Sequence, residues 1–493
     1  MSRRRQGNNK RRSAGVEAIR GSHARQGRMV EMDVREKTYL GVEIGRFTTN
    51  LRFEDLPADV IEKLKICLYF NLGISVAGAP LVRDGVAAVS HFPLAAGTGS
   101  RVFVEGTELP PTEAAFANAI MMHARAQDDF QHCANAHIGT VATPATLALA
   151  DLRGADGRTF LAAMAIAYQV ATVLGDGFAA ITTPRGFRAS GIYSTPGAAA
   201  GCARMLGLNE RQSAHAVGLA ASFAAGIGQP WVAGSMEWRL QVGQASRNAV
   251  FCALLAEAGC DAAPDAYEGQ YGFYAAHAQA DVDVAAMVAS LHGPWRTDTI
   301  AFKPLPLCAI NQGPAFNALA LARTLAVAPE EIATIEIQLP DDDAAYPGIA
   351  ATGPITSAGS ALMRTAYVVA VCLINGRLRY DDLEKRGSHA ILALADRAGV
   401  VGRSGLSPLS HVLRITTRDG NVLDRPYQAT GREFILGRAE IREIFASITD
   451  ELALPMECID ALEDVVWRLD RDADPADIVS TLQRQTAGRR ARA

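Results

Sequence analysis

The sequence PADVIEKLKICLYFNLGISVAG, residues 57–78, predicts a long helix that packs against other helices. Its apolar residues recur at intervals of three and four, which is the spacing of one helical face. They are Val60, Ile61, Leu64, Cys67, Leu68 and Leu72. Pro57 suits the first turn of a helix. Gly73 and Gly78 have no side chains, so neighbouring helices can approach the predicted helix closely there.

The helical pattern extends over most of the first 295 residues. Further helices are predicted at 112–126, 141–152, 158–174, 195–206, 210–226, 243–258 and 283–291. The loops between them carry Gly, Pro, Asp and Asn, which are the usual residues of turns. This part of the chain is therefore expected to be almost entirely helical.

The pattern changes near Trp295. Ile332–Leu339 alternates apolar and polar residues, as a half-buried strand does. His411–Thr417 and the residues from Val422 onward are joined by an Asp-Gly turn, which predicts a β-hairpin. Helices are predicted at 314–326 and 360–375, and again from about 439 to 485.

A chain of 493 residues is too long for one simple core, so two domains are expected. The predicted fold class is mainly α: a large all-helical domain formed by both chain ends, with an inserted smaller α+β domain. The predicted boundaries are 34–295 and 432–485 for the helical domain and 296–431 for the insertion.

Both termini are basic. The first 28 residues carry nine lysines and arginines against the single acid Glu17, with almost no apolar residues between them. We interpret residues 1–33 as a disordered basic extension. Two alternatives are a true start at Met29 or Met32 and an arm that binds nucleic acid. Residues 486–493 are interpreted as a second basic tail.

Composition excludes several classes of protein. The net charge of −4 argues against a protein that binds nucleic acid or a membrane surface. No apolar run approaches the roughly 20 residues of a membrane span. The eight cysteines form no CxxC pair, so neither a disulfide framework nor a compact zinc motif is expected. A cytoplasmic location is the default expectation.

The segment MMHARAQDDFQHCANAHIGTVATPATLALA, residues 121–150, holds the densest group of chemical side chains. These are His123, Asp128, Asp129, His132 and His137. Histidine exchanges protons near neutral pH, and a neighbouring carboxylate can fix its tautomer. The alternative is a solvated loop between two helices. A metal site is not predicted, because histidine spacings of 9 and 5 match no compact ligand motif.

Three further segments carry candidate binding groups. Residues 186–209 open a helix beside Arg188, where free backbone N–H groups and a guanidinium could meet an anion. Residues 228–250 contain Trp231, Trp238 and Arg239, which could line a pocket or pack a core. FKPLPLC, residues 302–308, presents Lys303 from a proline-stiffened backbone at the predicted domain boundary.

The order and separation of these segments resemble the MmgE/PrpD superfamily, over roughly residues 38–470. Its members include 2-methylcitrate dehydratase, cis-aconitate decarboxylase and iminodisuccinate epimerase. The pieces that carry the resemblance are GISVAGAP, the Asp pair and histidine before VATPATLALA, GAAAGCARMLGLNERQ, GQAS, KPLPLC and MRTAYVVAVCLING.

The resemblance implies a homodimer, a site between the two domains, and neither a metal nor an organic cofactor. It implies a small carboxylated substrate as the binding partner, with no nucleic acid and no membrane. The residues that it marks as catalytic are His137, Lys303, Tyr367 and Asp129. The residues that we predict to bind substrate are Asp128, His132, Arg188, Trp238, Arg239, Cys308 and Gln312.

Several of these positions depart from the family's usual residues. Arg188 stands where a histidine is common, and Trp238 followed by Arg239 stands where a lysine is frequent. Cys308 and Gln312 replace frequent histidines, and Phe130 follows the Asp pair in place of threonine.

The resulting prediction is a lyase or isomerase, of dehydratase, decarboxylase or epimerase type. It would abstract a proton next to a carboxylate of an anionic substrate that is not 2-methylcitrate. The alternative is a catalytically inactive relative that serves as a binding or scaffold protein.

Overall fold

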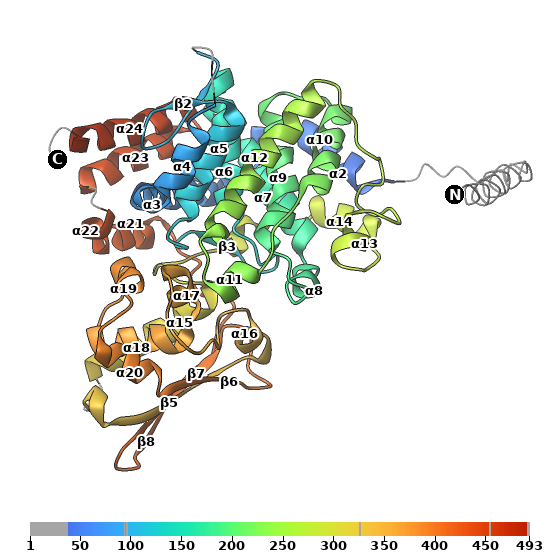
Figure 1. Cartoon of the computed structure of the whole chain (residues 1–493). Helices are drawn as coiled ribbons and strands as arrows, with labels where there is room; N and C mark the ends of the chain where they lie inside the picture. The colour runs from blue at the N-terminus through green and yellow to red at the C-terminus, as the bar shows by residue number, and fades with distance from the viewer. Residues whose placement is uncertain (1–37, 93, 95–96, 325–326, 453–454, 491–493) are drawn as a thin grey trace, which may run out of the picture. The chain divides into compact units, whose positions relative to one another are not determined.

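The computed structural model describes residues 38–490, apart from 93, 95–96, 325–326 and 453–454 (Figure 1). The described residues from Tyr39 onward form one compact unit. The predicted extension at 1–33 lies outside the described residues. The mainly α prediction is confirmed, since helices predominate and the strands are few.

The first part of the chain is helical. Its helices are α2 Leu40–Asn50, α3 Ala58–Gly78, α4 Arg83–Val89, α5 Pro111–His123, α6 Gly139–Arg153, α7 Gly157–Gly175, α8 Ala179–Thr182, α9 Ala189–Met205, α10 Glu210–Phe223, α11 Gln229–Ala233, α12 Glu237–Glu257, α13 Phe273–His277 and α14 Val284–Leu291. Short 3₁₀ turns lie at Phe53–Asp55, Ala79–Val82 and Arg296–Thr299. Four short strands were not predicted: β1 Ser100–Arg101, β2 Glu108–Leu109, β3 Asp129–Gln131 and β4 Ile300–Phe302. Two or three residues are too few for an alternating pattern to be recognised.

Helix α3 is the central element, and its glycines have the role that was predicted for them. A Cβ atom on Gly78 would lie 2.0 Å from the Met121 carbonyl oxygen of α5. A Cβ atom on Gly73 would lie 2.5 Å from the ring of Phe445, near the C-terminus. Both ends of the chain therefore contribute to the helical part, as Figure 1 shows for α3 and the C-terminal helices.

The C-terminal helices are α21 Arg438–Ser447, α22 Thr449–Leu452, α23 Met456–Arg468 and α24 Pro475–Arg490. The rings of Phe445 and Trp467 pack edge-on against Tyr69 of α3, at 5.0 and 5.6 Å between centroids. Helix α24 continues through Arg490, beyond residue 485, where the last helix was predicted to end.

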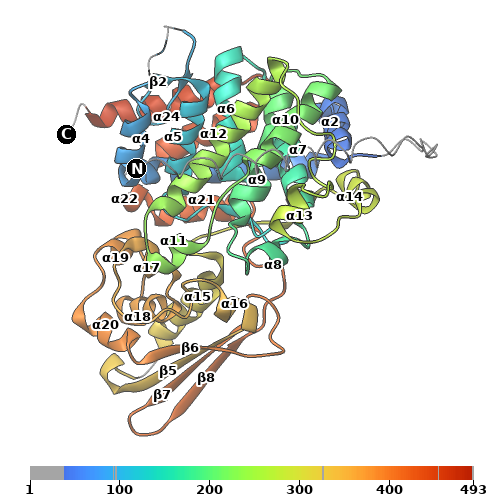
Figure 2. The same ribbon diagram turned by 45° about the vertical axis from the view of Figure 1, so that its right-hand side comes forward.

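The remaining elements surround a four-stranded sheet. They are α15 Ala309–Thr324, a 3₁₀ turn at Pro329–Glu331, β5 Ile332–Leu339, α16 Asp341–Ala345, α17 Ala358–Met363, α18 Thr365–Asn375, α19 Tyr380–Glu384, α20 His389–Ala395, β6 Ala398–Gly402, β7 His411–Thr417 and β8 Val422–Tyr427. The strand order is β6-β5-β7-β8, with only β6 and β5 parallel. Helices α15 and α18 pack against the sheet (Figure 2).

The strands β5 and β7 and the hairpin to β8 lie where the sequence predicted them. Strand β6 was missed, because its sequence AGVVG contains two glycines and shows no clear alternation of apolar and polar residues. The described residues contain one large apolar core in the helical part and another around the sheet. The division into domains at residues 295 and 431 stays a prediction.

Two stretches, Ala58–Val89 and Gly157–Gly175, are long and apolar enough to resemble membrane spans. Their most apolar windows are 83% and 89% buried inside the protein. Packing in the core therefore accounts for their composition, as it does in the central helices of globular proteins.

The pairing of β3 with β4 positions the residues that matter for function. Asp129 lies opposite Phe302 in this antiparallel pair. The next residues outward, Asp128 on one strand and Lys303 on the other, are therefore neighbours at the end of the pair.

We expect Gly78→Ala to lower the melting temperature clearly, because the added methyl group collides with the backbone of α5. Overpacking of a core typically costs about 1–3 kcal/mol. Thermal unfolding followed by calorimetry measures the effect. Gly399→Ala is the control, since a Cβ atom there would meet no described atom within 4 Å. Equal melting temperatures for the two variants would contradict the close approach of α3 and α5.

Candidate functional site

Five buried or half-buried residues from distant parts of the chain meet at one place, which we call the histidine–aspartate cluster. They are His123, Asp128, His137, Arg188 and Lys303. His123 ends α5, Asp128 precedes β3 and His137 precedes α6. Arg188 is the residue before α9, and Lys303 follows β4.

Asp128 is the centre of the cluster. The Lys303 ammonium contacts its Oδ1 atom, and the His123 ring contacts Oδ2 through Nδ1. The His137 Nδ1 atom lies 3.4 Å from Oδ1. Burial alone would raise the pKa of Asp128, but the Lys303 charge and both histidines hold that pKa well below its usual range. The cluster therefore contains an ionised carboxylate paired with a lysine.

Arg188 determines the tautomer of His123. A terminal guanidinium nitrogen of Arg188 lies 2.6 Å from His123 Nε2. Arginine can only donate, so Nε2 accepts and the ring proton sits on Nδ1, from which it is donated to Asp128. Burial lowers the pKa of His123 to about 4, and the imidazole is therefore neutral at pH 7. Arg188 also donates to the Trp238 carbonyl oxygen and, at 3.3 Å, to Gln241.

His137 is the member of the cluster whose side chain is partly accessible, at 19% exposure. Its backbone N–H donates to the Ser190 hydroxyl at 3.0 Å. Its Nδ1 atom lies 3.1 Å from the Asp129 carbonyl oxygen and also faces Asp128. Two oxygen acceptors favour a proton on Nδ1, which leaves the lone pair on Nε2. Lys303 Nζ also lies 3.5 Å from Nδ1, but it makes its shorter contact with Asp128.

The protonation state of His137 follows from its surroundings. Burial and the Lys303 charge lower the pKa of His137 well below its usual value. The ring is therefore neutral at pH 7 and able to accept a proton at Nε2.

Asp129 faces away from the cluster into the helical core. Its Oδ2 atom accepts a hydrogen bond from the Tyr168 hydroxyl, and its backbone N–H donates to Asn71 at 3.1 Å. A Cβ atom on Gly139 would lie 2.6 Å from the same carboxylate. Burial raises the pKa of Asp129 to about 6. Asp129 thus contacts the core helices through its Oδ2 atom and its backbone, and the catalytic role predicted for it stays a prediction.

Tyr367, which was predicted to be catalytic, is not accessible to solvent. The residue is fully buried in the core around the sheet, and its hydroxyl donates to the Asp382 carbonyl oxygen at 2.6 Å. Arg239 is also engaged elsewhere. Its guanidinium donates to the Ala124 carbonyl oxygen at 2.9 Å and to the Tyr380 hydroxyl. The Tyr367 hydroxyl and two of the three Arg239 guanidinium nitrogens therefore bind groups outside the cluster.

Of the other residues predicted to bind substrate, Trp238 lies beside the cluster, whereas His132 and Gln312 make their contacts elsewhere. His132 is exposed, with its ring edge-on to Phe130, and Gln312 uses its amide to bind the backbone of Leu305. Trp238 is buried beside the cluster, with its ring 5.1 Å from that of His123. Cys308 is partly buried, and burial raises its pKa to about 12, so the thiol is not ionised at pH 7.

Tyr346 was missed from the sequence. It follows α16, and burial raises the pKa of its phenol while the nearby Arg188 charge opposes the rise. The Cys308 thiol also contributes to raising that pKa. The aspartates before Tyr346 form no recognisable motif, and nothing in the sequence marks its closeness to Arg188.

The donors of His123, Asp128 and His137 lie within 4.8 Å of one another, a geometry that could hold a metal ion. Two positively charged side chains already contact these donors, since Lys303 binds Asp128 and Arg188 binds His123. A metal cation placed among them would be repelled by both side chains. The set therefore fits a metal poorly, and a metal-free enzyme remains our prediction.

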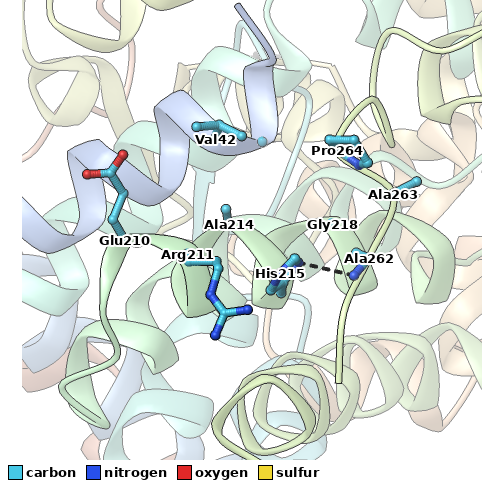
Figure 3. Close-up of a pocket in the computed structure, with 10 residues that line it drawn as sticks. Val42, Glu210, Arg211, Ala214, His215, Gly218, Ala262, Ala263 and Pro264 are labelled. Atoms are coloured by element: carbon cyan, nitrogen blue, oxygen red, sulfur yellow. Dashed lines mark hydrogen bonds between the residues drawn. The ribbon is translucent and has the colours of Figure 1, made fainter. Parts of the chain in front are cut away.

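A pocket of about 260 Å³ lies elsewhere, between α2, α10 and residues 262–264 (Figure 3). Its wall is mostly apolar, and His215 on α10 accepts a hydrogen bond from the Ala262 N–H at 3.2 Å. None of its lining residues belongs to the histidine–aspartate cluster. The chemistry of the cluster, and not the size of this hollow, identifies the candidate site.

Comparison with known proteins identifies similar sequences over most of the chain. The family model of the MmgE/PrpD N-terminal domain matches residues 42–284. The cis-aconitate decarboxylase of Aspergillus terreus is 25% identical, over 91% of this chain and 97% of its own. The cis-aconitate decarboxylase-like protein oryM of Aspergillus oryzae is 24% identical, over 89% and 96% of the two chains. The human cis-aconitate decarboxylase is 26% identical over 52% of this chain and 54% of its own.

The matched range 42–284 contains His123, Asp128, His137 and Arg188, whereas Lys303 lies beyond it. The similarity to cis-aconitate decarboxylases supports a lyase-type enzyme. With the helical core and the loop chemistry described above, these matches show that this chain belongs to the MmgE/PrpD superfamily.

Proposed function

We propose that the chain is a cofactor-independent lyase that moves a proton next to a carboxylate of a small anionic substrate. One observation carries the proposal. A neutral His137, with its lone pair on Nε2, stands beside the Asp128–Lys303 pair and the fixed cation Arg188. This arrangement combines a proton carrier with a positive charge in one water-poor place.

The net charge of the cluster favours the binding of a substrate carboxylate. Lys303 and Arg188 contribute two positive charges, Asp128 contributes one negative charge, and both histidines are neutral. The cluster therefore carries a net positive charge, which a substrate carboxylate would neutralise. Fixed cations also stabilise the negative charge that develops when the adjacent carbon gains an electron pair.

His137 is proposed as the acid or base. A neutral imidazole can take a proton at Nε2 and return it, while Nδ1 stays hydrogen-bonded to the Asp129 carbonyl oxygen. Tyr346, a partly buried phenol whose pKa responds to the Arg188 charge, is proposed as a second proton donor or substrate contact.

The relatives named cis-aconitate decarboxylase favour a decarboxylase among the three reaction types. In a decarboxylation the bond to the leaving carboxylate breaks, CO₂ departs, and the electron pair left on carbon takes up one proton. One proton carrier and a stabilising cation suffice for that reaction. Dehydration needs acid assistance to the leaving hydroxide, and epimerisation needs proton carriers on both faces.

The walls of the site favour a substrate with fewer carboxylates than a tricarboxylate. Trp231 and Trp238 lie with ring centroids 5.0 Å apart, and Arg188 packs over Trp231 at 5.1 Å. An apolar wall thus stands where the family often has a lysine. We therefore propose that 2-methylcitrate is not the substrate.

Purified enzyme in D₂O should incorporate deuterium next to the carboxylate of its substrate, as followed by proton NMR. The panel comprises 2-methylcitrate, citrate, cis-aconitate and smaller unsaturated mono- and dicarboxylates. We expect exchange or turnover among the smaller acids. Turnover of 2-methylcitrate near a kcat/KM of ~10⁴ M⁻¹s⁻¹ would contradict the proposed substrate class. Thermal stabilisation by the acids without any exchange or product would instead identify a binding protein.

His137→Gln should reduce kcat roughly 10²–10⁴-fold on the substrate found in this way, because an amide cannot carry the proton. The melting temperature should change little, since the side chain is partly exposed. His132→Gln is the matched control, from the same loop but outside the cluster, and it should keep wild-type kcat. A His137→Gln enzyme with full activity would remove this residue from the mechanism.

The chain is also proposed to form a homodimer. Large apolar side chains remain exposed along α10, α11 and α12 and the turns between them, at Phe223, Ile227, Val232, Met236 and Phe251. Light scattering at micromolar concentration should return twice the chain mass of 52.3 kDa. Phe251→Glu should shift the equilibrium toward monomer by placing a charge in the apolar face. A wild-type mass near that of one chain would overturn the proposal.

A further inference from the structure

A buried ion pair links the end of α5 to the C-terminal helix α22. The Arg125 guanidinium lies 2.5 Å from the Glu451 carboxylate, and both side chains are almost fully covered. Arg125 stands three residues before Asp128, whereas Glu451 lies far beyond the matched range 42–284. No step proposed above uses this pair.

The pair continues into the histidine–aspartate cluster through Gln127. Arg125 Nε donates to Gln127 Oε1 at 3.1 Å, which orients the amide. The Gln127 Nε2 atom then donates to the Pro304 carbonyl oxygen at 2.6 Å. Gln127 directly precedes Asp128, and Pro304 directly follows Lys303. These hydrogen bonds therefore connect the ion pair to the residue before Asp128 and to the residue after Lys303.

Tyr380 of α19 covers the ion pair. Its ring lies under the Arg125 guanidinium at 5.1 Å, and its backbone N–H donates to Glu451 at 3.4 Å. Its hydroxyl accepts from Arg239, which also binds the Ala124 carbonyl oxygen. These contacts hold the segment from Ala124 to Asp128 on both sides. That segment contains Ala126 at a φ of +53°, a backbone conformation that needs such support.

We propose that Arg125 and Glu451 are positioning residues that set Lys303 against Asp128 through the Gln127 amide. Without the Glu451 charge, the buried Arg125 guanidinium would lack a counter-charge. Because that is costly, we expect the side chain to move toward solvent. Gln127 would then lose the donor that orients its amide, and the Pro304 carbonyl would lose its fixed partner. The expected loss of activity rests on the proposed function, whereas the expected displacement of Lys303 does not.

The test is Glu451→Gln in the full chain, with two readouts. Brief acetylation with acetic anhydride, followed by mass spectrometry, should show little label on Lys303 in the wild type, where this side chain is buried and paired. In the variant the label on Lys303 should rise several-fold. The kcat should fall roughly 10- to 100-fold with little change in KM, as expected when a reacting group is misplaced by about 1 Å. Glu451→Asp should recover part of kcat.

Glu463→Gln is the matched control. Glu463 is also a buried carboxylate on the C-terminal helices, paired with Arg438 and Arg442, and it should leave Lys303 protected. Lys63, buried on α3, reports general loosening. Unchanged protection of Lys303 in Glu451→Gln would overturn the inference, and so would equal labelling of Lys63 and Lys303. Selective labelling of Lys303 with no turnover by any variant would support the positioning and refute the proposed function.

Discussion

The contact between the Asp128 carboxylate and the Lys303 ammonium is the constraint around which the site is arranged. The two residues are distant in the sequence, and the register of β3 with β4 brings them together. Removing two charges from water is costly unless further hydrogen bonds surround them. His123 and His137 meet that need on the two oxygens of Asp128, while Asn71 and Tyr168 hold the loop from behind.

Arg188 gives this site its particular character. A histidine at that position could exchange protons, whereas arginine remains charged and can only donate. It therefore keeps His123 neutral, with its proton directed to Asp128, and leaves His137 as the histidine with a free nitrogen. The substitution separates the two histidines by role: His123 supports Asp128, and His137 carries the proton in the proposed mechanism.

The sequence predicts the architecture well, because long periodic segments such as residues 57–78 and 332–339 carry unambiguous patterns. The sequence also marks Lys303, Asp128, His137 and Arg188 as candidates through local motifs, and the structure places these residues together. Tyr367 was chosen because it lies in a recognisable motif, but its neighbours bury it. The contribution of Tyr346 depends on packing between distant elements, and no pattern in a single sequence records such packing.

The C-terminal helices have a consequence for how the protein is made. Phe445 and Trp467 cover Tyr69 on α3, and Glu451 completes the surroundings of Arg125. A ribosome synthesises α3 early and these partners last. The central helix must therefore leave part of its apolar face uncovered until the end of translation, a state that favours aggregation or chaperone binding. A nascent chain that stops short of α21 would lack both that cover and the counter-charge of Arg125.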